Sequence, residues 1–447
     1  MENVLVAKNN DVEKKNVNKN KYLFEKCDGT DYAIAVTAGV IAGFVDVIFV
    51  GKASKDSSES ILGAKIDRLT DNAVINIANF HRKTKGIKGE VNNIASAIRY
   101  FEDKYKVNYE HKWTAETGGM VKGLRTTNHH FKSLDHVPDL IGLFFSVMDQ
   151  FNNTASFMSD GQLIIIDASD RGIRLQGNNL ISKIFCGICN WFFHIMSDVA
   201  GSTQSRNSLG EGRGTGVTIP GMEFFNLCNF GSFKNGDETN TLAQSMVKVF
   251  ESGYDLRFGA AMAIPVLLQD LIIRVLWVIR ARYDKGREWK ECIPNAKHGD
   301  LRVMLIVGDA TLCVIDGADA VIRSGGNFVE FVLRMNFIAW MRLVKLVLKE
   351  VMIRLGADAE DMSEVLARIN EDLKEYLYQL RQIDIETFER EARELEELDR
   401  KIIMASSEKE ITVLLYGEMK RQGITLPFGN HEEFNRFMAD DSQKLIL

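Results

Sequence analysis

Proline is scarce in this sequence. Among 447 residues it occurs only at Pro138, Pro220, Pro265, Pro294 and Pro427. Because proline disrupts hydrogen bonding in the interior of a helix, the long stretches between these positions are free to be helical. A chain of this length with 45% hydrophobic residues can also fill a sizeable core. We therefore predict a mainly α-helical fold: a large helical protein with packed apolar helices and a charged C-terminal helical region.

The sequence also has no cysteine framework and no excess of basic residues. Its six cysteines are scattered without disulfide spacing, which is typical of reduced thiols, so we expect a cytoplasmic protein. A net charge of −6 gives no basic field, and we expect no nucleic-acid partner. The first apolar run is too short for a signal peptide, and Lys/Asn-rich sequence follows it. Residues 1–30 are therefore predicted to be a disordered tail.

Changes in composition divide the rest of the chain. Gly210, Gly212, Gly214 and Gly216 alternate with other residues, but no Gly-Lys-Ser/Thr follows, so the segment is interpreted as a mobile loop and not as a phosphate-binding loop. The predicted regions are an N-terminal helical region (31–200), this Gly-rich loop (201–220), an apolar helical core region (221–356) and a charged helical C-terminal region (357–447).

One long apolar run contains a regular pattern of small residues. Ala35, Gly39 and Gly43 fall four apart within residues 32–50, which puts them on one helix face and predicts glycine-zipper-like packing against another helix. The length suits a bilayer span, but a charged residue such as Asp46 costs about 2.5–3.5 kcal/mol near mid-membrane. A buried core helix and a membrane-associated helix therefore both stay open.

Other apolar runs are interrupted by charges in the same way. Residues 179–200 contain Lys183, His194 and Asp198, and residues 259–283 are interrupted by Asp270, Arg274 and Arg280. Aromatic residues beside Arg and Lys on such helices suit a membrane surface or a partner groove, but a large helical core has the same pattern. Between 300 and 350, we expect a helical hairpin that pairs an acidic with a basic face: Asp309, Asp316 and Asp319 with Arg342, Lys345 and Lys349.

The groups most able to do chemistry are concentrated in residues 128–170. The candidate catalytic residues are His130, Asp135, His136 and Asp139, since imidazole and carboxylate are suitable ligands for a metal-dependent hydrolase. The spacing matches no established metal motif, so the identity of a metal is unknown. Asp139 follows Pro138, and capping of the next helix is the competing interpretation.

Three neighbouring features receive structural interpretations. Adjacent side chains are expected to point apart, so His129 is predicted to add little beside His130. The run QLIIID at 162–167 is predicted to be a strand that ends in a turn carboxylate. Cys186 and Cys189, followed by His194, provide three groups able to start a zinc site, but without a fourth ligand they are interpreted as buried small residues.

Three segments carry a resemblance to a family: VGDATLCVIDGADAVIRSGGNFVEFVLRMNFIAWMRLVKLVLKEV, AVTAGVIAGFVDVIFVGK and LDHVPDLIGLFFSVMDQF. With these Gly/Ala-rich helices, the chain resembles an uncharacterised family of bacterial proteins of Firmicutes type. The resemblance implies no catalytic residue. It implies a context among accessory genes, and hence a role in phage defence or in a mobile element.

These features lead to three hypotheses of function. The first is a non-enzymatic, self-associating protein that engages the cytoplasmic membrane, as a defence effector that perturbs the bilayer. The second is a metal-dependent hydrolase that uses the four His and Asp candidates. The third is a soluble scaffold for a protein partner. No organic cofactor is expected, and the cytoplasmic protein would bind the membrane peripherally or conditionally.

Overall fold

The computed structural model describes most of the chain as helices. The described residues are 22–55, 59–107, 119–168, 175, 178–203, 205–206, 212–354, 385–421, 430, 432–433 and 436. They form a mainly α fold with two small two-stranded sheets, which confirms the predicted fold class. The chain divides into two compact units, Met1–Val351 and Met352–Leu447. The predicted region boundaries are not tested by this division.

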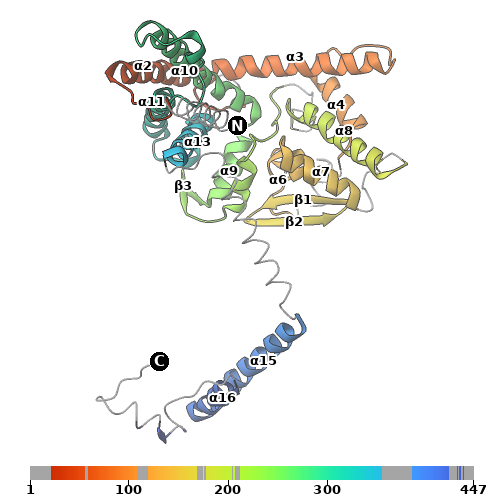
Figure 1. Cartoon of the computed structure of the whole chain (residues 1–447). Helices are drawn as coiled ribbons and strands as arrows, with labels where there is room; N and C mark the ends of the chain where they lie inside the picture. The colour runs from red at the N-terminus through yellow and green to blue at the C-terminus, as the bar shows by residue number, and fades with distance from the viewer. Residues whose placement is uncertain are drawn as a thin grey trace, which may run out of the picture. The chain divides into compact units, whose positions relative to one another are not determined.

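Four long helices of the first unit pack into a bundle: α2 (Gly29–Val45) with its π-helical extension η1 (Asp46–Val50), α10 (Leu256–Tyr283), α11 (Gly299–Ser324) and α13 (Phe337–Arg354) (Figure 1). Helix α11 runs in the same direction as α2, because Gly39 lies against Gly308 and Gly43 against Ile315. Helix α10 runs in the opposite direction, since Arg280 near its end bonds to Asp31 at the start of α2.

The small residues of α2 lie in its contact with α11. Ala35 is fully buried, and a Cβ atom added at Gly39 would lie 2.5 Å from the carbonyl oxygen of Gly308. A Cβ atom added at Gly43 would lie 2.8 Å from Cδ1 of Ile315. The two backbones therefore approach so closely that only glycine fits at these positions without a shift.

Polar and charged side chains occupy the interior of this bundle. Near one end, Nδ2 of Asn336 donates to Asp46 at 2.6 Å. In the middle, Nε2 of Gln269 donates to Asp309 at 3.1 Å, and at the other end Nε of Arg302 donates to Glu350 at 2.6 Å. The predicted hairpin between α11 and α13 is present only in part. One predicted pair is close, since Arg342 lies 3.4 Å from Asp309. The other two aspartates have different partners: Asp316 accepts hydrogen bonds from Trp340 and Asn336, and Asp319 pairs with Arg323. The predicted basic partners Lys345 and Lys349 are exposed.

The outer surface of the bundle is apolar. Exposed large hydrophobic side chains occur on all four helices: Val36, Ile41, Phe44 and Ile48 on α2 and η1, Leu267, Leu271, Val275 and Ile279 on α10, Val314, Val321 and Ile322 on α11, and Met341, Val344, Val347 and Leu348 on α13. Among the described residues, three helical segments are long and apolar enough to cross a membrane: Gly29–Val50, Leu180–Asp198 and Leu256–Tyr283. The first and third belong to this bundle.

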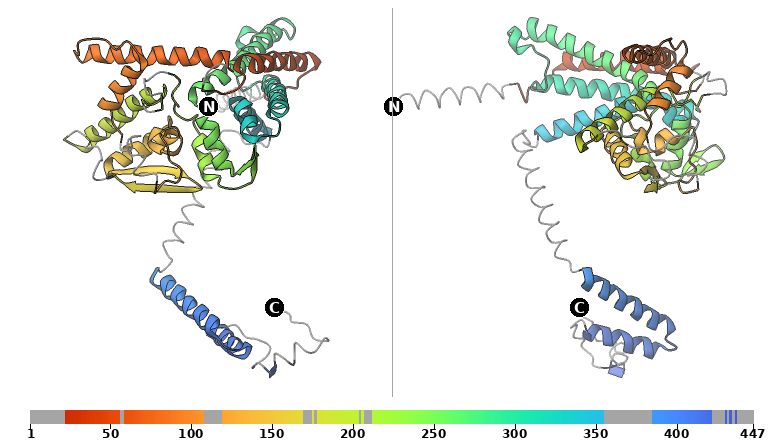
Figure 2. Two further views of the ribbon diagram at one scale, coloured as in Figure 1. Left: turned by 180° about the vertical axis from the view of Figure 1, so that it is seen from behind. Right: turned by 90° about the vertical axis from the view of Figure 1, so that its right-hand side faces the viewer.

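A second group of helices lies beside the bundle: α3 (Ile61–Thr84), α4 (Ile94–Lys104), α7 (Leu140–Asn152) and α8 (Leu180–Asp198), with α3 leading away from the bundle (Figures 1 and 2). Helices α3, α4 and α8 share a core that contains Val74, Ala97 and Phe101. The strand predicted at 162–167 is confirmed as β2 (Gln162–Asp167). It pairs antiparallel with β1 (Thr154–Ser159) through a turn at Asp160 and Gly161.

Short elements connect the two groups. They are α6 (His129–Lys132), η3 (Leu134–His136), η4 (Met222–Leu227), the hairpin of β3 (Phe233–Asn235) and β4 (Glu238–Asn240), α9 (Leu242–Glu251), η5 (Trp289–Glu291) and α12 (Phe328–Arg334). Phe131 of α6, Met222 of η4, Phe250 of α9 and Leu333 of α12 belong to one core with the first turns of α10. This core fixes α6 between the bundle and the second group of helices.

The segment predicted as a mobile loop, 201–220, is packed where the structure describes it. Residues 214–219 are buried, and Nη2 of Arg257 donates to the carbonyl oxygen of Gly214. A Cβ atom at Gly216 would lie 2.8 Å from Asp255. The glycines thus permit close packing, which a sequence pattern of alternating glycine does not distinguish from flexibility.

The second unit contains α15 (Ile385–Met404) and α16 (Glu408–Arg421). These two helices carry exposed ion pairs such as Lys401 with Glu397 and Arg421 with Glu418. Residues 355–384, most of the tail after 421, and residues 1–21 of the predicted disordered tail lie outside the described residues.

Candidate metal centre

Four histidines and one aspartate meet in the interior of the first unit. His129 and His130 come from α6, His136 from η3, and His194 and Asp198 from the last turns of α8. All five are at most 3% exposed. The ring centroids of His129 and His130 lie 3.9 Å apart, and those of His136 and His194 lie 5.1 Å apart. Residues far apart in the sequence therefore form one compact cluster, which we call the histidine centre.

The turn before α6 is held by Asn128. Its Oδ1 accepts from the backbone N–H of Arg125 at 2.8 Å, and its Nδ2 donates to the carbonyl of Gly123 at 3.0 Å and to Glu251 at 3.1 Å. A side chain that bonds its own turn in this way stabilises a short helical turn against alternatives. It thereby positions the two following histidines.

After η3 the chain turns sharply into α7. Oδ1 of Asp139 accepts from the backbone N–H groups of Ile141 at 2.8 Å and Gly142 at 3.0 Å, so Asp139 is the N-cap of α7. Glycine is required at 142, because a Cβ atom there would lie 1.9 Å from the carbonyl oxygen of Val137. This tight turn keeps η3, and with it His136, against the end of α8.

Backbone carbonyls orient three of the imidazoles. Nδ1 of His129 bonds to the carbonyl of Thr126 at 2.8 Å, and Nδ1 of His194 bonds to that of Tyr105 at 2.8 Å. Nδ1 of His130 lies 3.2 Å from the carbonyl oxygens of both Thr215 and Gly216. Because a carbonyl can only accept, each Nδ1 donates, and in the neutral ring Nε2 carries the lone pair. Metal-binding histidines in proteins are oriented in this way.

The Asp198 carboxylate connects three of the four rings: His130, His136 and His194. Its Oδ2 lies 2.7 Å from Nδ1 of His136 and 3.4 Å from Nε2 of His194, and its Oδ1 lies 3.5 Å from Nε2 of His130. Although burial opposes it, the nearby His194 and His130 hold the pKa of Asp198 well below its usual range. Asp198 is therefore a carboxylate, and it orients His136 as a carboxylate orients the histidine of a zinc site.

Two of the imidazoles that contact this carboxylate, His136 and His130, differ in basicity. Burial lowers the pKa of His136 to about 4, in spite of its hydrogen bond to Asp198. For His130, burial also lowers the pKa, but the Asp198 charge and the carbonyls of Thr215 and Gly216 outweigh it and raise the pKa. A neutral His136 has a nitrogen lone pair, which a metal ion requires.

Two overlapping sets of side chains have the geometry to hold a metal ion. His129, His130 and His136 form one set, and His136, His194 and Asp198 form the other; in each set the potential ligand atoms lie within 4.8 Å of one another. Three imidazoles, or two imidazoles and a carboxylate, are donor sets that suit zinc and related divalent transition metals. The two sets share His136, so it is the residue on which metal binding depends most.

The structure brings together only part of the predicted site. His130 and His136 belong to the histidine centre. Asp135 is fully buried in η3, but neither metal-binding set contains it. Asp139 is an N-cap, as the competing interpretation predicted, and it lies beside Glu223. Burial, together with the Asp139 charge, raises the pKa of Glu223 to about 7.

Sequence analysis missed three members of the centre. His129 was predicted to point away from His130, which is wrong, because both rings of the short helix α6 reach the same cluster. Asp198 was noted only as a polar interruption, and His194 was weighed as a zinc ligand only beside Cys186 and Cys189, although the four-residue spacing of His194 and Asp198 puts them on one face of α8. Cys186 and Cys189 lie on the same helix, half-buried, and neither belongs to a metal-binding set.

Comparison with known proteins adds no relative: no family model, no curated protein and no solved structure matches this chain. The resemblance described from the sequence therefore stays a prediction. The geometry of the chain itself has to carry any proposal of function.

Proposed function

We propose that this protein binds a divalent transition metal in the histidine centre and is embedded in a membrane through its helical bundle. The observation that carries the first part is the orientation of the imidazoles. Three of them donate from Nδ1 to backbone carbonyls, and the fourth, His136, donates to Asp198. Such donation fixes the tautomer and raises the basicity of the opposite nitrogen, which favours metal binding.

Burial of the centre favours metal binding over hydrolysis in this conformation. A catalytic metal activates water at a coordination position that substrate can reach, whereas a structural metal is enclosed by protein ligands. Every side chain of the histidine centre is at most 3% exposed. The metal would therefore join η3 to α6 through the first set or to α8 through the second, and the hydrolase hypothesis would additionally require an opening that admits substrate.

Metal content tests this part of the proposal. Protein purified without chelator is measured by elemental analysis, together with protein stripped and reloaded with Zn²⁺. We expect about one metal ion per chain, and we expect His136→Ala to lose it because His136 belongs to both sets. His298→Gln is the matched control, since His298 is a buried histidine before α11 that belongs to neither metal-binding set. Absence of stoichiometric metal in the reloaded wild type, or full metal in His136→Ala, would overturn the proposal.

The second part, membrane embedding, is supported by the inverted polarity of the bundle. Asp46, Asp309 and Asp316 are at most 4% exposed inside it, while Phe44, Leu271 and Val314 are at least 58% exposed on its surface. Soluble monomers rarely expose a contiguous apolar surface of this kind, whereas ionisable residues of membrane proteins face the interior of the bundle. At 1.5 Å per residue, Gly29–Val50 extends about 33 Å, enough for a hydrocarbon core of about 30 Å.

Flotation with liposomes of bacterial lipid composition tests the membrane proposal. The wild-type protein is expected to float and to resist extraction at alkaline pH. The double variant Leu267→Glu/Leu271→Glu changes two exposed residues of α10 and is expected to float less, because each charge must enter the apolar region. Leu163→Glu, on the exposed face of β2, is the matched control and is expected to behave like wild type. Wild-type protein that stays at the bottom as a soluble particle would overturn the membrane proposal.

Self-association and a role as a phage-defence effector stay predictions from the sequence. The apolar faces of the bundle are compatible with a second copy as well as with lipid. A soluble oligomer in the flotation experiment would indicate that the apolar faces of the bundle pack against a second copy of the chain. That result would favour the scaffold hypothesis over a membrane-perturbing effector.

A further inference from the structure

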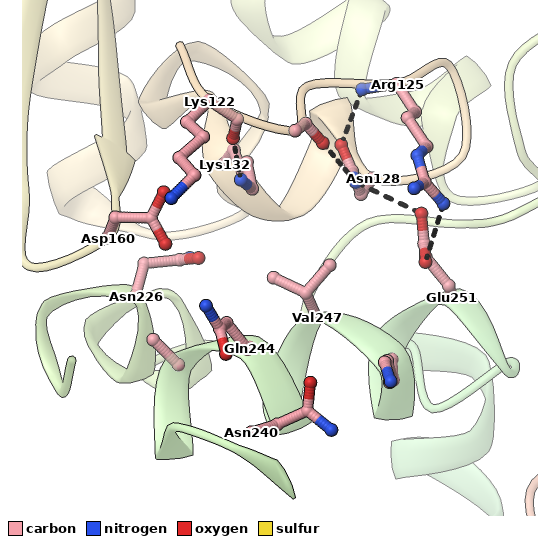
Figure 3. Close-up of a pocket in the computed structure, with 13 residues that line it drawn as sticks. Lys122, Arg125, Asn128, Lys132, Asp160, Asn226, Asn240, Gln244, Val247 and Glu251 are labelled. Atoms are coloured by element: carbon pink, nitrogen blue, oxygen red, sulfur yellow. Dashed lines mark hydrogen bonds and ion pairs between the residues drawn. The ribbon is translucent and has the colours of Figure 1, made fainter. Parts of the chain in front are cut away.

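A pocket lined mainly by polar side chains, Asn128 and Lys132 among them, lies beside α6. It has a volume of about 210 Å³. Figure 3 shows Lys122, Asn128 and Lys132 on one wall and Gln244, Val247 and Glu251 of α9 on the other. None of the five side chains of the histidine centre lines it. It is therefore a separate site, formed where the loop before α6 faces α9.

The cations of the pocket differ in whether they already have partners. Lys248 pairs with Glu238 at 2.5 Å, and Arg125 lies 4.0 Å from Glu251. Lys122 and Lys132 form no ion pair with any residue that the structure describes. The pocket thus contains two cations with no carboxylate at ion-pair distance among the described residues, while Asp160 and Glu251 act on Lys132 from further away.

Lys132 is buried, and two of the three N–H donors of its ammonium group are used within the protein. It is 5% exposed, and its Nζ donates to the carbonyl of Lys122 at 2.6 Å and to Oγ of Ser159 at 2.9 Å. An ammonium has three N–H donors, so one remains after these two bonds. A buried charge is costly unless it is paired, which makes an anion the expected ligand for the third donor.

Asn226 supplies a buried acceptor to the same pocket. It is 1% exposed, and its Nδ2 donates to the carbonyls of Phe131 at 2.9 Å and Glu223 at 3.1 Å. Two carbonyl partners fix the orientation of the amide, because Oδ1 in their place could not donate. Oδ1 therefore points toward the pocket (Figure 3), where it accepts no hydrogen bond from the described residues. A ligand that satisfies it must donate a hydrogen bond.

We propose that this pocket binds a small phosphate ester of a polyol, with the phosphate at Lys122 and Lys132 and a hydroxyl donating to Oδ1 of Asn226. Two cations match a phosphate dianion, and charge-assisted hydrogen bonds of this type are the strong ones. Asp160, which also lines the pocket, is a second acceptor for hydroxyl groups.

The test is calorimetric titration of the whole protein in detergent or nanodiscs with sn-glycerol 3-phosphate, inorganic phosphate and glycerol. We expect saturable binding of glycerol 3-phosphate, weaker binding of phosphate and none of glycerol. Loss of one charge-assisted hydrogen bond weakens binding about tenfold or more, so Lys122→Gln and Lys132→Gln should both show this loss. Lys234→Gln, at an exposed lysine of β3 outside the pocket, is the matched control and should bind like wild type.

Two results would overturn the proposal. One is the absence of saturable binding of glycerol 3-phosphate by the wild type up to about 10 mM, a concentration well above a millimolar dissociation constant. The other is unchanged affinity in Lys122→Gln, whose exposed side chain can be replaced without loss of the fold. Binding is expected to persist in His136→Ala, so failure of the metal proposal and failure of this one are distinguishable.

Discussion

The contact between α2 and α11 gives a quantitative prediction for Gly39→Ala. The new Cβ atom would lie 2.5 Å from the carbonyl oxygen of Gly308 and 2.6 Å from Cβ of Thr311. The first of these is backbone and cannot rotate away, so the two helices have to separate. Overpacking of this kind costs about 1–3 kcal/mol, whereas alanine in a helix gains up to about 1 kcal/mol over glycine. With the full helical gain of about 1 kcal/mol, we expect a net loss of about 0–2 kcal/mol relative to wild type, and about 1–3 kcal/mol relative to an alanine variant of the same helix without the clash.

The midpoint of thermal unfolding in one detergent measures this loss. Since 1 kcal/mol shifts the midpoint by about 2–4 °C in domains of 150–250 residues, a fall of a few degrees relative to such an alanine variant is expected. Gly29→Ala is the matched control, because it lies in the first turn of the same helix and a Cβ atom there meets nothing within 4 Å. It should leave the midpoint unchanged or raise it. A Gly39→Ala midpoint equal to that of Gly29→Ala would refute the close approach of the two helices.

Two further predictions concern aspartates that cap helices: Asp255 at the start of α10 and Asp139 at the start of α7. Burial alone would raise the pKa of Asp255, but Arg213 and Arg257 outweigh it and lower the pKa from 3.8 to about 2. The carboxylate therefore contributes about 2 kcal/mol to the free energy of unfolding at pH values above 4. This contribution is lost as the pH falls toward 2. The stability difference between wild type and Asp255→Asn should therefore shrink between pH 4 and 2.5 in thermal unfolding, and a difference independent of pH would contradict it. Asp139→Ala removes the N-cap of α7 and should cost about 1 kcal/mol without changing the metal content; loss of metal would instead indicate that Asp139 acts in the centre.

Local patterns in the sequence predicted the elements that depend on local chemistry. The strand β2 follows from a short β-branched run, and the cap at Asp139 follows from Pro138 and the apolar helix after it. The helix that contains Gly39 follows from an apolar run of the right length. In each case the residues that decide the structure are neighbours in the chain, so no tertiary information was needed.

The histidine centre could not be assembled from local pattern, because its parts come from segments 62 residues apart. His136 and Asp198 meet only because α8 packs on η3 and α7. The error over His129 has a similar origin: adjacent residues point apart along a strand, but in a four-residue helix they differ by about 100° and both can face one cluster. One part of the centre could have been predicted from the sequence: His194 and Asp198 are four residues apart on a mainly apolar helix. Polar residues on one helix face indicate a common partner.

Whether a charge within an apolar run opposes membrane insertion depends on the helix face on which it lies. Counted along the sequence, Asp46 and Asp309 weigh against a membrane helix, since each carries a cost in hydrocarbon. In the fold both are buried against other helices, where Asn336 and Gln269 donate hydrogen bonds to them. The free-energy cost of placing a charge in hydrocarbon therefore does not apply to these two aspartates. The large side chains exposed on the outer face of α2 and α10 are mainly apolar. The same charges that left the sequence undecided between core and membrane are thus compatible with the membrane proposal once the face on which they lie is known.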